Sequence, residues 1–369
     1  MPVILRQSLI GLLLLVLAAL PACRQSAPTT SPATAPELTP PEPADMDAFE
    51  SLPDVVTLDN GQLAVGISPA VGRIVSLIPA GGDNLLWRAT RRQIAADRAR
   101  RQWHYFNWGG DKVWPALQLS WERMFSQNGP WPPPPIIDGD PWKVVEQTPL
   151  ALTLESGINT QLNVQVRRRI ELDADRPHLV IANTITRIKP SPYPVMIWSI
   201  TQVKTPQSTF LAIADDRPDP ATPWIVMSPQ STFDPAWVTP LDAAIAVRPD
   251  FAGVPEAKSS MKVGAFGRFI AAAWDKHLLV ERVNFEPRGS YPDGSNIQVY
   301  SDLIYTEIET LSPQVHLQPG ESLTNTIHWF VLPRPAGDDP ALLSAITAPA
   351  PAPGSVPSPT PAPVPPPAR

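Results

Sequence analysis

The sequence predicts an all-β fold, a sandwich or a barrel, flanked by disordered Pro-rich segments at both ends. Three observations support this prediction. Short segments of extended character recur at close spacing, with Pro and Gly residues between them. No apolar period of 3.6 residues is sustained over the length of a core helix. Mostly Pro, Ala, Ser and Thr occupy the segments on either side. The same pattern excludes a parallel α/β sheet and therefore the dinucleotide-binding folds.

The first element is an N-terminal signal, predicted over residues 1–22. Arg6 supplies a positive charge, and an unbroken apolar run from Leu9 to Ala19 follows. That run is too short to span a bilayer core, which needs ~20 apolar residues. Residues 1–22 are therefore expected to be removed on export.

The end of this segment reads Leu20-Pro21-Ala22-Cys23 and resembles the lipobox of bacterial lipoproteins. The resemblance implies that Cys23 is lipidated and that the chain is cleaved just before it. Cys23 is the only cysteine of the 369 residues, so an intrachain disulfide is excluded. Arg24 in place of Asp favours, by resemblance to the sorting rule, an outer-membrane anchor facing the periplasm. An ordinary secreted protein is the alternative.

The rest of the chain divides into a tether, a domain and a tail. Residues 23–45 are rich in Pro, Ala and Thr and cannot bury enough surface to offset their ordering entropy. Residues 46–335 form the predicted β-sandwich domain. Residues 336–369 form a Pro- and Ala-rich tail, predicted to be disordered and extended. The net charge of −6 gives no indication of a nucleic-acid partner.

Strands are predicted throughout the domain. Residues 55–58 and 62–65 form a hairpin, because Asn60-Gly61 suits the positive φ of a tight turn. Residues 161–166 alternate polar with apolar side chains, as a half-buried strand does. Further strands are predicted over residues 178–187, 195–203, 261–266, 269–274, 278–284, 296–300, 304–310 and 322–332.

Residues 103–142 contain half of the twelve tryptophans of the chain. This stretch lacks strand alternation and is rich in Gly and Pro, so it is predicted to be a long ordered loop. Aromatic rings beside Asn, Asp, Lys and His suit a sugar site, because the apolar face of a pyranose packs on a ring while polar groups bind its hydroxyls. Alternatively, the tryptophans close the open end of a sandwich. The candidate ligand-binding residues are His104, Asn107, Trp108, Asp111, Lys112, Trp114, Trp131 and Trp142.

Two parts of the chain resemble known families. Residues 109–116 read Gly-Gly-Asp-Lys-Val-Trp-Pro-Ala, and residues 131–133 and 139–142 read Trp-Pro-Pro and Gly-Asp-Pro-Trp. They are similar to the signature of an uncharacterised bacterial domain family of the galactose-mutarotase-like superfamily. Residues 307–322, with a Leu-Gln-Pro-Gly-Glu turn, resemble the late strand of aldose 1-epimerases. The resemblance implies a galactose-mutarotase-like β-supersandwich over residues 50–333.

The late resemblance implies a catalytic base. Mutarotation needs a base for the anomeric hydroxyl and an acid for the ring oxygen. Glu309 matches the base of the family by its spacing to the Pro-Gly turn. Glu307 lies two residues earlier and therefore shares the same strand face, where two carboxylates would raise one pKa. A solvated pair of glutamates on a strand is the alternative.

The acid has no counterpart in the sequence. Epimerases carry a histidine within a His-x-Tyr-Phe-Asn motif on a central strand, and residues 195–202 contain no histidine. His104-Tyr105-Phe106-Asn107 is one residue short of that motif and comes too early in the chain. No nucleophile elbow, zinc helix or phosphate loop occurs either. We therefore expect no cofactor and no metal.

Three functions are weighed from these observations. The first is a non-catalytic carbohydrate-binding lipoprotein of the cell envelope, with a cleft formed by the tryptophan-rich segment above Glu307 and Glu309. The second is an aldose 1-epimerase-like or related sugar-processing enzyme that uses Glu309. The third is an envelope scaffold whose aromatic loop and Pro-rich tail contact protein partners.

Overall fold

The computed structural model describes Leu52, Gln93 and residues 54–90, 106–126, 131–227 and 232–349. The predicted signal peptide, Cys23, the predicted tether and His104 lie outside the described residues, as does the tail from residue 350 onward. None of the described helices is both long enough and apolar enough to cross a membrane.

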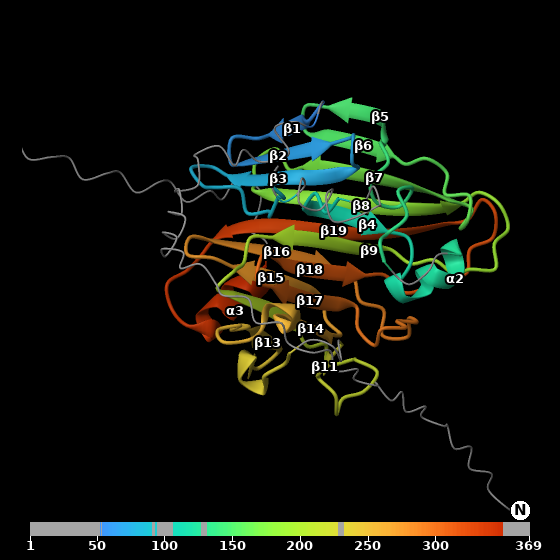
Figure 1. Cartoon of the computed structure of the whole chain (residues 1–369). Helices are drawn as coiled ribbons and strands as arrows, with labels where there is room; N and C mark the ends of the chain where they lie inside the picture. The colour runs from blue at the N-terminus through green and yellow to red at the C-terminus, as the bar shows by residue number, and fades with distance from the viewer. Residues whose placement is uncertain are drawn as a thin grey trace, which may run out of the picture. The chain divides into compact units, whose positions relative to one another are not determined.

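Two antiparallel sheets make up the domain (Figure 1). This architecture confirms the predicted all-β fold. Within the described residues, the first sheet has nine strands. Their order is β1 (Val56–Asp59), β2 (Leu63–Ser68), β3 (Arg73–Pro79), β4 (Gly110–Trp114), β9 (Trp198–Val203), β18 (Thr306–Leu311), β17 (Ile297–Asp302), β14 (Ser260–Ala265) and β11 (Trp224–Val226).

The second sheet has ten strands in the part of the chain that the structure describes. Their order is β12 (Val238–Pro240), β13 (Ala244–Val247), β10 (Ser208–Ala212), β15 (Phe269–Ala273), β16 (His277–Val283), β19 (Ser322–Pro333), β8 (His178–Arg187), β7 (Val164–Leu172), β6 (Ala151–Glu155) and β5 (Lys143–Thr148). The predicted strands 178–187, 269–274 and 322–332 agree with β8, β15 and β19 to within one residue.

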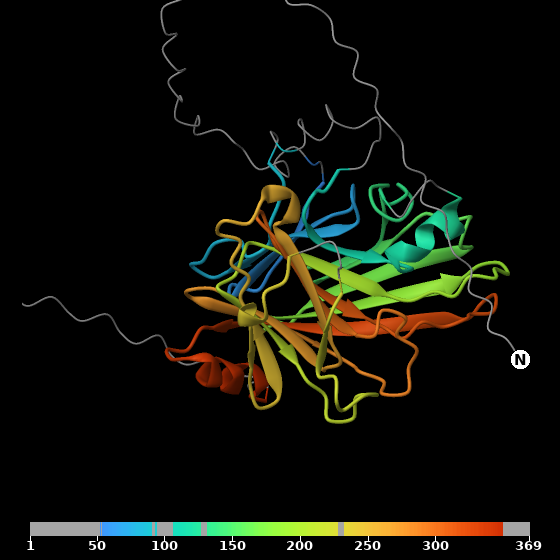
Figure 2. The same cartoon turned by 60° about the horizontal axis from the view of Figure 1, so that its bottom comes forward.

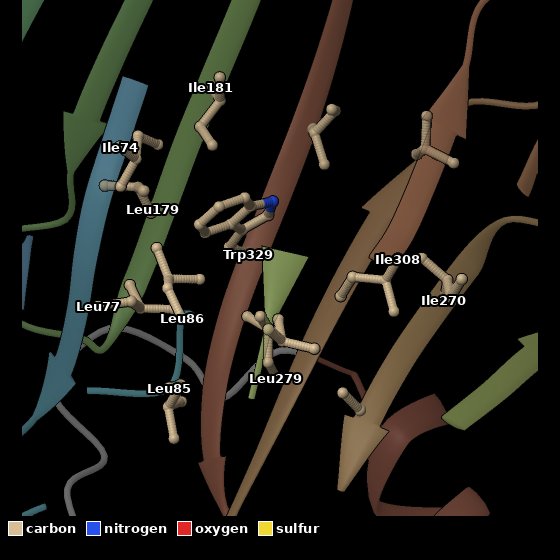
Figure 3. Packing of buried hydrophobic residues seen from close by; sticks show 14 of the residues in the cluster. Ile74, Leu77, Leu85, Leu86, Leu179, Ile181, Ile270, Leu279, Ile308 and Trp329 are labelled. Atoms are coloured by element: carbon tan, nitrogen blue, oxygen red, sulfur yellow. The ribbon is translucent and has the colours of Figure 1, made fainter. Parts of the chain in front are cut away.

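The core fills the space between the sheets. Trp329 of β19 is fully buried among leucine and isoleucine side chains that come from both sheets (Figure 3). Ile74 on β3 and Ile308 on β18 contribute to the same core cluster from the nine-stranded sheet, and Ile181 on β8 and Leu279 on β16 from the other. Each such side chain contributes about 1.5–3 kcal/mol on burial, so the packing of the sheets fixes which face of every strand looks outward.

Short helices complete the described chain. They are the α-helices α2 (Trp121–Phe125) and α3 (Asp339–Thr347) and the 3₁₀ segments Gln118–Ser120, Pro235–Trp237 and Glu256–Lys258. In the views of Figures 1 and 2, α3 (red) and α2 (teal) lie on opposite sides of the domain.

The domain extends past its predicted end at Pro335. Asp338 caps α3 by accepting a hydrogen bond from the Ala341 amide. Leu342 and Ile346 of α3 are buried against the ten-stranded sheet, on the face that points away from the core. Residues 336–369 are mostly Pro and Ala, and Leu342 and Ile346 are too few to indicate a helix. The sequence therefore predicts that they belong to the tail.

Strand β4 lies inside the segment that was predicted to be a loop. All five of its residues, Gly110–Trp114, are buried, and both of its faces are covered. A strand that is covered on both sides has no reason to alternate polar with apolar residues. The loop prediction was therefore wrong for β4, and the correction places Lys112 and Trp114 in a sheet beside β9.

Candidate functional site

The two predicted glutamates lie on β18, between β9 and β17 in the nine-stranded sheet. Ile308 points into the core between the sheets, so Glu307 and Glu309 point to the opposite side. We call this side of β4, β9, β18, β17 and β14 the outer face. Glu309 has no exposed surface and Glu307 is half-buried, which argues against a fully solvated pair.

The register of the strands places further side chains in two rows across the outer face, because directly opposed residues of neighbouring strands share a face. The row through Glu309 contains Gly264, Gln298, Glu309, Ile200 and Lys112. The row through Glu307 contains Lys262, Tyr300, Glu307, Gln202 and Gly110.

Glu309 is held by two donors. Lys262 Nζ lies 3.0 Å from Oε1 and 2.8 Å from Oε2 of Glu309. The Trp198 indole Nε1 donates to Oε2 at 2.9 Å. Burial raises the pKa of Glu309 to about 7, although the Lys262 ammonium opposes this shift. A carboxyl group that titrates near neutral pH suits general acid–base chemistry.

Glu307 has a different environment. Its Oε1 accepts a hydrogen bond from Gln202 Nε2 at 2.8 Å. Gln202 is fully buried, and none of the described residues donates to its Oε1. Tyr300, opposite Glu307 on β17, donates its hydroxyl to Asp302 Oδ2 at 3.3 Å. Burial, then Asp302 and Glu307, raise the pKa of Tyr300, so the phenol stays protonated.

Lys112 is buried on the outer face, and a carboxylate from residues 131–142 balances its positive charge. Its Nζ lies 3.7 Å from Asp138 Oδ2 and 4.4 Å from the centre of the Trp114 ring. Asp138 also accepts from Trp114 Nε1 at 3.1 Å and pairs with the buried Arg73. Burial lowers the pKa of Lys112, and Asp138 opposes this shift. Asp138 thus positions the predicted site lysine.

Aromatic residues flank the acidic row. Trp87 and Tyr305 pack with ring centres 4.6 Å apart, and Tyr300 lies 6.2 Å from Tyr305. All three are half-buried. Asn107 Nδ2 donates to Tyr305 Oη at 3.3 Å. Of the predicted ligand-binding residues, Asn107, Lys112 and Trp114 are therefore associated with this side of the sheet.

Asp111 lies on the other face, and its placement in the predicted cleft is corrected. It is buried between the sheets, where it pairs with Arg168 of β7 and accepts from Thr201 Oγ1 at 3.2 Å. The reason is the period of two residues in a strand, which puts neighbours such as Asp111 and Lys112 on opposite faces.

The remaining tryptophans are not brought together at Glu309. Trp108 packs against Phe106 and the Val71–Val75 cluster. Trp142 packs against both large core clusters and lies over Gly72. Trp131 is 40% exposed in the segment that leads to Asp138. Trp142 therefore helps to close the sandwich, which is the alternative explanation of the tryptophan-rich segment. Trp121 instead packs on Trp114, which contacts Trp198 on the outer face.

Four residues of the outer face are not among the site residues predicted from the sequence: Lys262, Gln202, Trp198 and Tyr300. One signal that was present is the Met261-Lys262-Val263 pattern, in which a lysine alternates with two buried residues of β14. Nothing in the sequence alone indicates that β14 approaches β18 through β17. Among the described residues, no three His, Cys, Asp or Glu side chains are arranged to hold a metal ion.

No protein-family model matches the sequence, and no curated protein matches it. A solved galactose mutarotase-like protein from Lactobacillus casei is similar in structure, with a TM-score of 0.50 at 9% identity over 76% of this chain and 100% of the other. A galactose mutarotase related enzyme from Lactobacillus acidophilus has a TM-score of 0.48 at 11% identity, over 76% and 97% of the two chains. The expectation from the sequence is confirmed at the level of the fold: this chain has the galactose mutarotase-like β-sandwich fold.

Proposed function

We propose that this chain is a carbohydrate-binding lipoprotein of the cell envelope, and that the outer face around Glu307 and Glu309 is its binding site. One observation carries the proposal: four neighbouring strands present carboxylate, ammonium and amide groups on one face, beside the half-buried rings of Trp87, Tyr300 and Tyr305. Carboxylates and amides bind sugar hydroxyls, and the rings provide an apolar surface for the sugar CH groups.

The lipid anchor and the outer-membrane location are part of the same proposal. They are supported by the Leu-Pro-Ala-Cys sequence before residue 24 and by the use of the sole cysteine at that point. Metabolic labelling with a radioactive fatty acid should mark the native chain and not the Cys23→Ser variant. Equal labelling of both would contradict the anchor.

A second candidate function is the sugar-processing one, and the Glu309–Lys262 pair favours it. Ionised Glu309 would take the anomeric hydroxyl proton while the C1–O5 bond breaks and C1=O1 forms. The Lys262 ammonium would give its proton to O5, and reclosure on the other face of C1 would return both protons. Lysine would thus take the place of the histidine of the epimerases. The five strands of the outer face, β4, β9, β14, β17 and β18, contain no histidine.

The test is a calorimetric titration of the full chain with mono- and oligosaccharides. We expect saturable binding that Glu309→Gln weakens, because the amide cannot retain the Lys262 ion pair. The control is Glu146→Gln, which changes an exposed carboxylate on the edge strand β5. If no saccharide binds, the proposal fails and an envelope scaffold becomes the better explanation.

Polarimetry separates the two candidates. Fresh α-glucose and α-galactose should reach anomeric equilibrium at the uncatalysed rate if the protein only binds sugars. Acceleration that is lost in Glu309→Gln by about 10²-fold or more would establish the sugar-processing function instead.

A further inference from the structure

The acidic end of the outer face consists of hydrogen-bond acceptors. The Gln202 amide is oriented by Glu307, because its Nε2 donates to the carboxylate at 2.8 Å. Because Nε2 makes this contact, the amide oxygen Oε1 of Gln202 is left for another partner. Gln202 is fully buried, and no described group donates to that oxygen. A buried acceptor calls for a donor, which an ordered water or a ligand can supply, and at Gln202 this acceptor lies beside the Glu307 carboxylate.

Asp302 adds further acceptor atoms at the same end. Its Oδ1 accepts the backbone amides of Ile304 and Tyr305 at 2.7 and 2.9 Å, and its Oδ2 accepts the Tyr300 hydroxyl. Neither Asp302 nor Glu307 forms an ion pair with a described residue. Burial and then the charge of Glu307 raise the pKa of Asp302, which is what two neighbouring carboxylates without a cation should show.

The nearest lysine across the register does not fill this gap. Lys262 lies opposite Tyr300, but its ammonium binds both oxygens of Glu309. Its side chain is only 18% exposed, so it is held in this pair. The acidic end therefore offers the Gln202 amide oxygen, the Glu307 carboxylate and the Tyr300 phenol oxygen, all half-buried or buried, as acceptors.

An ammonium group matches such a set, because it has three donors and no acceptor. A sugar hydroxyl has a single proton to give, so it can donate to only one of these acceptors. We propose that the ligand of this site is an amino sugar with a free ammonium group, which docks between Gln202, Glu307 and Tyr300. This inference rests on the proposed carbohydrate-binding function and names its substrate class.

N-acetylation provides the sharpest discrimination. The acetamide of an N-acetylated sugar has one N–H donor and a carbonyl acceptor, and it carries no charge. It should therefore lose the contacts that an ammonium makes with Glu307, and charge-assisted hydrogen bonds are the stronger kind. We expect the free amino sugar to bind at least about tenfold more tightly than its N-acetyl form and than the neutral sugar.

The experiment is a calorimetric titration of the full chain with glucosamine, N-acetylglucosamine and glucose at pH 6.5. Glu307→Gln should remove the preference for glucosamine while weak binding of glucose remains. Asp302→Asn is the second variant and should reduce the preference if Glu307→Gln fails to fold. Glu146→Gln, far from the acidic row on β5, should leave the preference unchanged. Thermal unfolding checks that each variant is folded.

The outcomes are distinguishable. Equal affinity for the three sugars, or a preference that survives in Glu307→Gln, would overturn the amino-sugar inference and leave the carbohydrate-binding proposal standing. Failure of every saccharide to bind would overturn both.

Discussion

Adjacent residues of β4 and β9 form two polar clusters, one on each face of the sheet. The two clusters differ in how many of their polar atoms have hydrogen-bond partners. Asp111 and Thr201 point between the sheets, and Lys112 and Gln202 point outward. Inside, Arg168 donates to both Asp111 and Asn183, and Asn183 donates to Ser199 at 3.0 Å. Outside, Glu307 has one donor and Gln202 Oε1 has none among the described residues.

The inner cluster also holds a proton. Thr201 Oγ1 lies 2.7 Å from Glu281 Oε1 and 3.2 Å from Asp111 Oδ2. A hydroxyl has one proton, so one of the two carboxyl groups must donate. Burial raises the pKa of Glu281 well above its usual range, and Glu281 is therefore the donor. The ion pair and hydrogen bonds of the inner cluster join the two sheets, although Glu281 Oε2 has no hydrogen-bond partner among the described residues. On the outer face, the Gln202 Oε1 acceptor lies beside a carboxylate that forms no ion pair with a described residue, and this combination suits a ligand.

The largest expected effect comes from breaking the inner cluster. Arg168→Met leaves Asp111 buried without its ion-pair partner, and the loss should be about 3–5 kcal/mol of unfolding free energy. The neighbouring Arg167→Met removes a pair with Glu155 in which the arginine side chain is 58% exposed, and it should cost less than about 1 kcal/mol. Urea unfolding measures both. Similar losses in the two variants would mean that the inner cluster does not join the sheets.

A smaller effect concerns the buried proton. Folded Glu281 keeps its proton above pH 4.5, where the unfolded chain releases it, so stability falls as the pH rises from 4.5 toward the folded pKa. In Glu281→Gln the amide can donate to Thr201 at every pH. We expect the variant to gain at least about 1 kcal/mol relative to the wild type between pH 5 and pH 8. Parallel pH profiles of unfolding free energy would assign the proton to another group.

The smallest expected effect is a change in the pKa of Glu309 on the outer face. Because Lys262 lowers the pKa of Glu309, Lys262→Met should move the midpoint of Glu309 above its wild-type value of about 7. Trp198 donates to Glu309 and should report the titration by fluorescence. Trp198→Phe is the control and should abolish the transition. A midpoint that stays constant or falls in Lys262→Met would show that the lysine does not govern Glu309.

Much of the fold follows from the sequence alone. Strand β8 has one face toward the core and one half-exposed, alternates visibly and agrees with its prediction. The strand predicted over residues 161–166 is only partly correct, because residues 161–163 form a turn and β7 begins at Val164. Strand β4 is covered on both faces and β10 is buried throughout, so their sequences do not alternate and were not recognised. The limit is physical, since alternation reports a difference in environment between the two faces.

The site was predictable in part. The two-residue spacing of Glu307 and Glu309 places them together once a strand is assumed, and Lys112 and Trp114 join them through β9. The prediction that Asp111 lies in the same cleft is wrong because residues 110–114 form a strand, in which the period of two turns Asp111 to the other face. Lys262 was missed because the pairing of β14 with β17 is a contact between distant parts of the chain that no local pattern encodes.

The alternation on β9 has a consequence for insertions and deletions. Removing one residue from Trp198–Val203 would turn Thr201 toward solvent and drive the Gln202 amide between the sheets. Such a deletion would disconnect Glu281 and Glu307 from their partners at once, so recognition and folding should fail together. The number of residues in this strand therefore determines both the inner contacts of Thr201 and the outer contacts of Gln202. A substitution can change one set of contacts alone, whereas a change of length alters both.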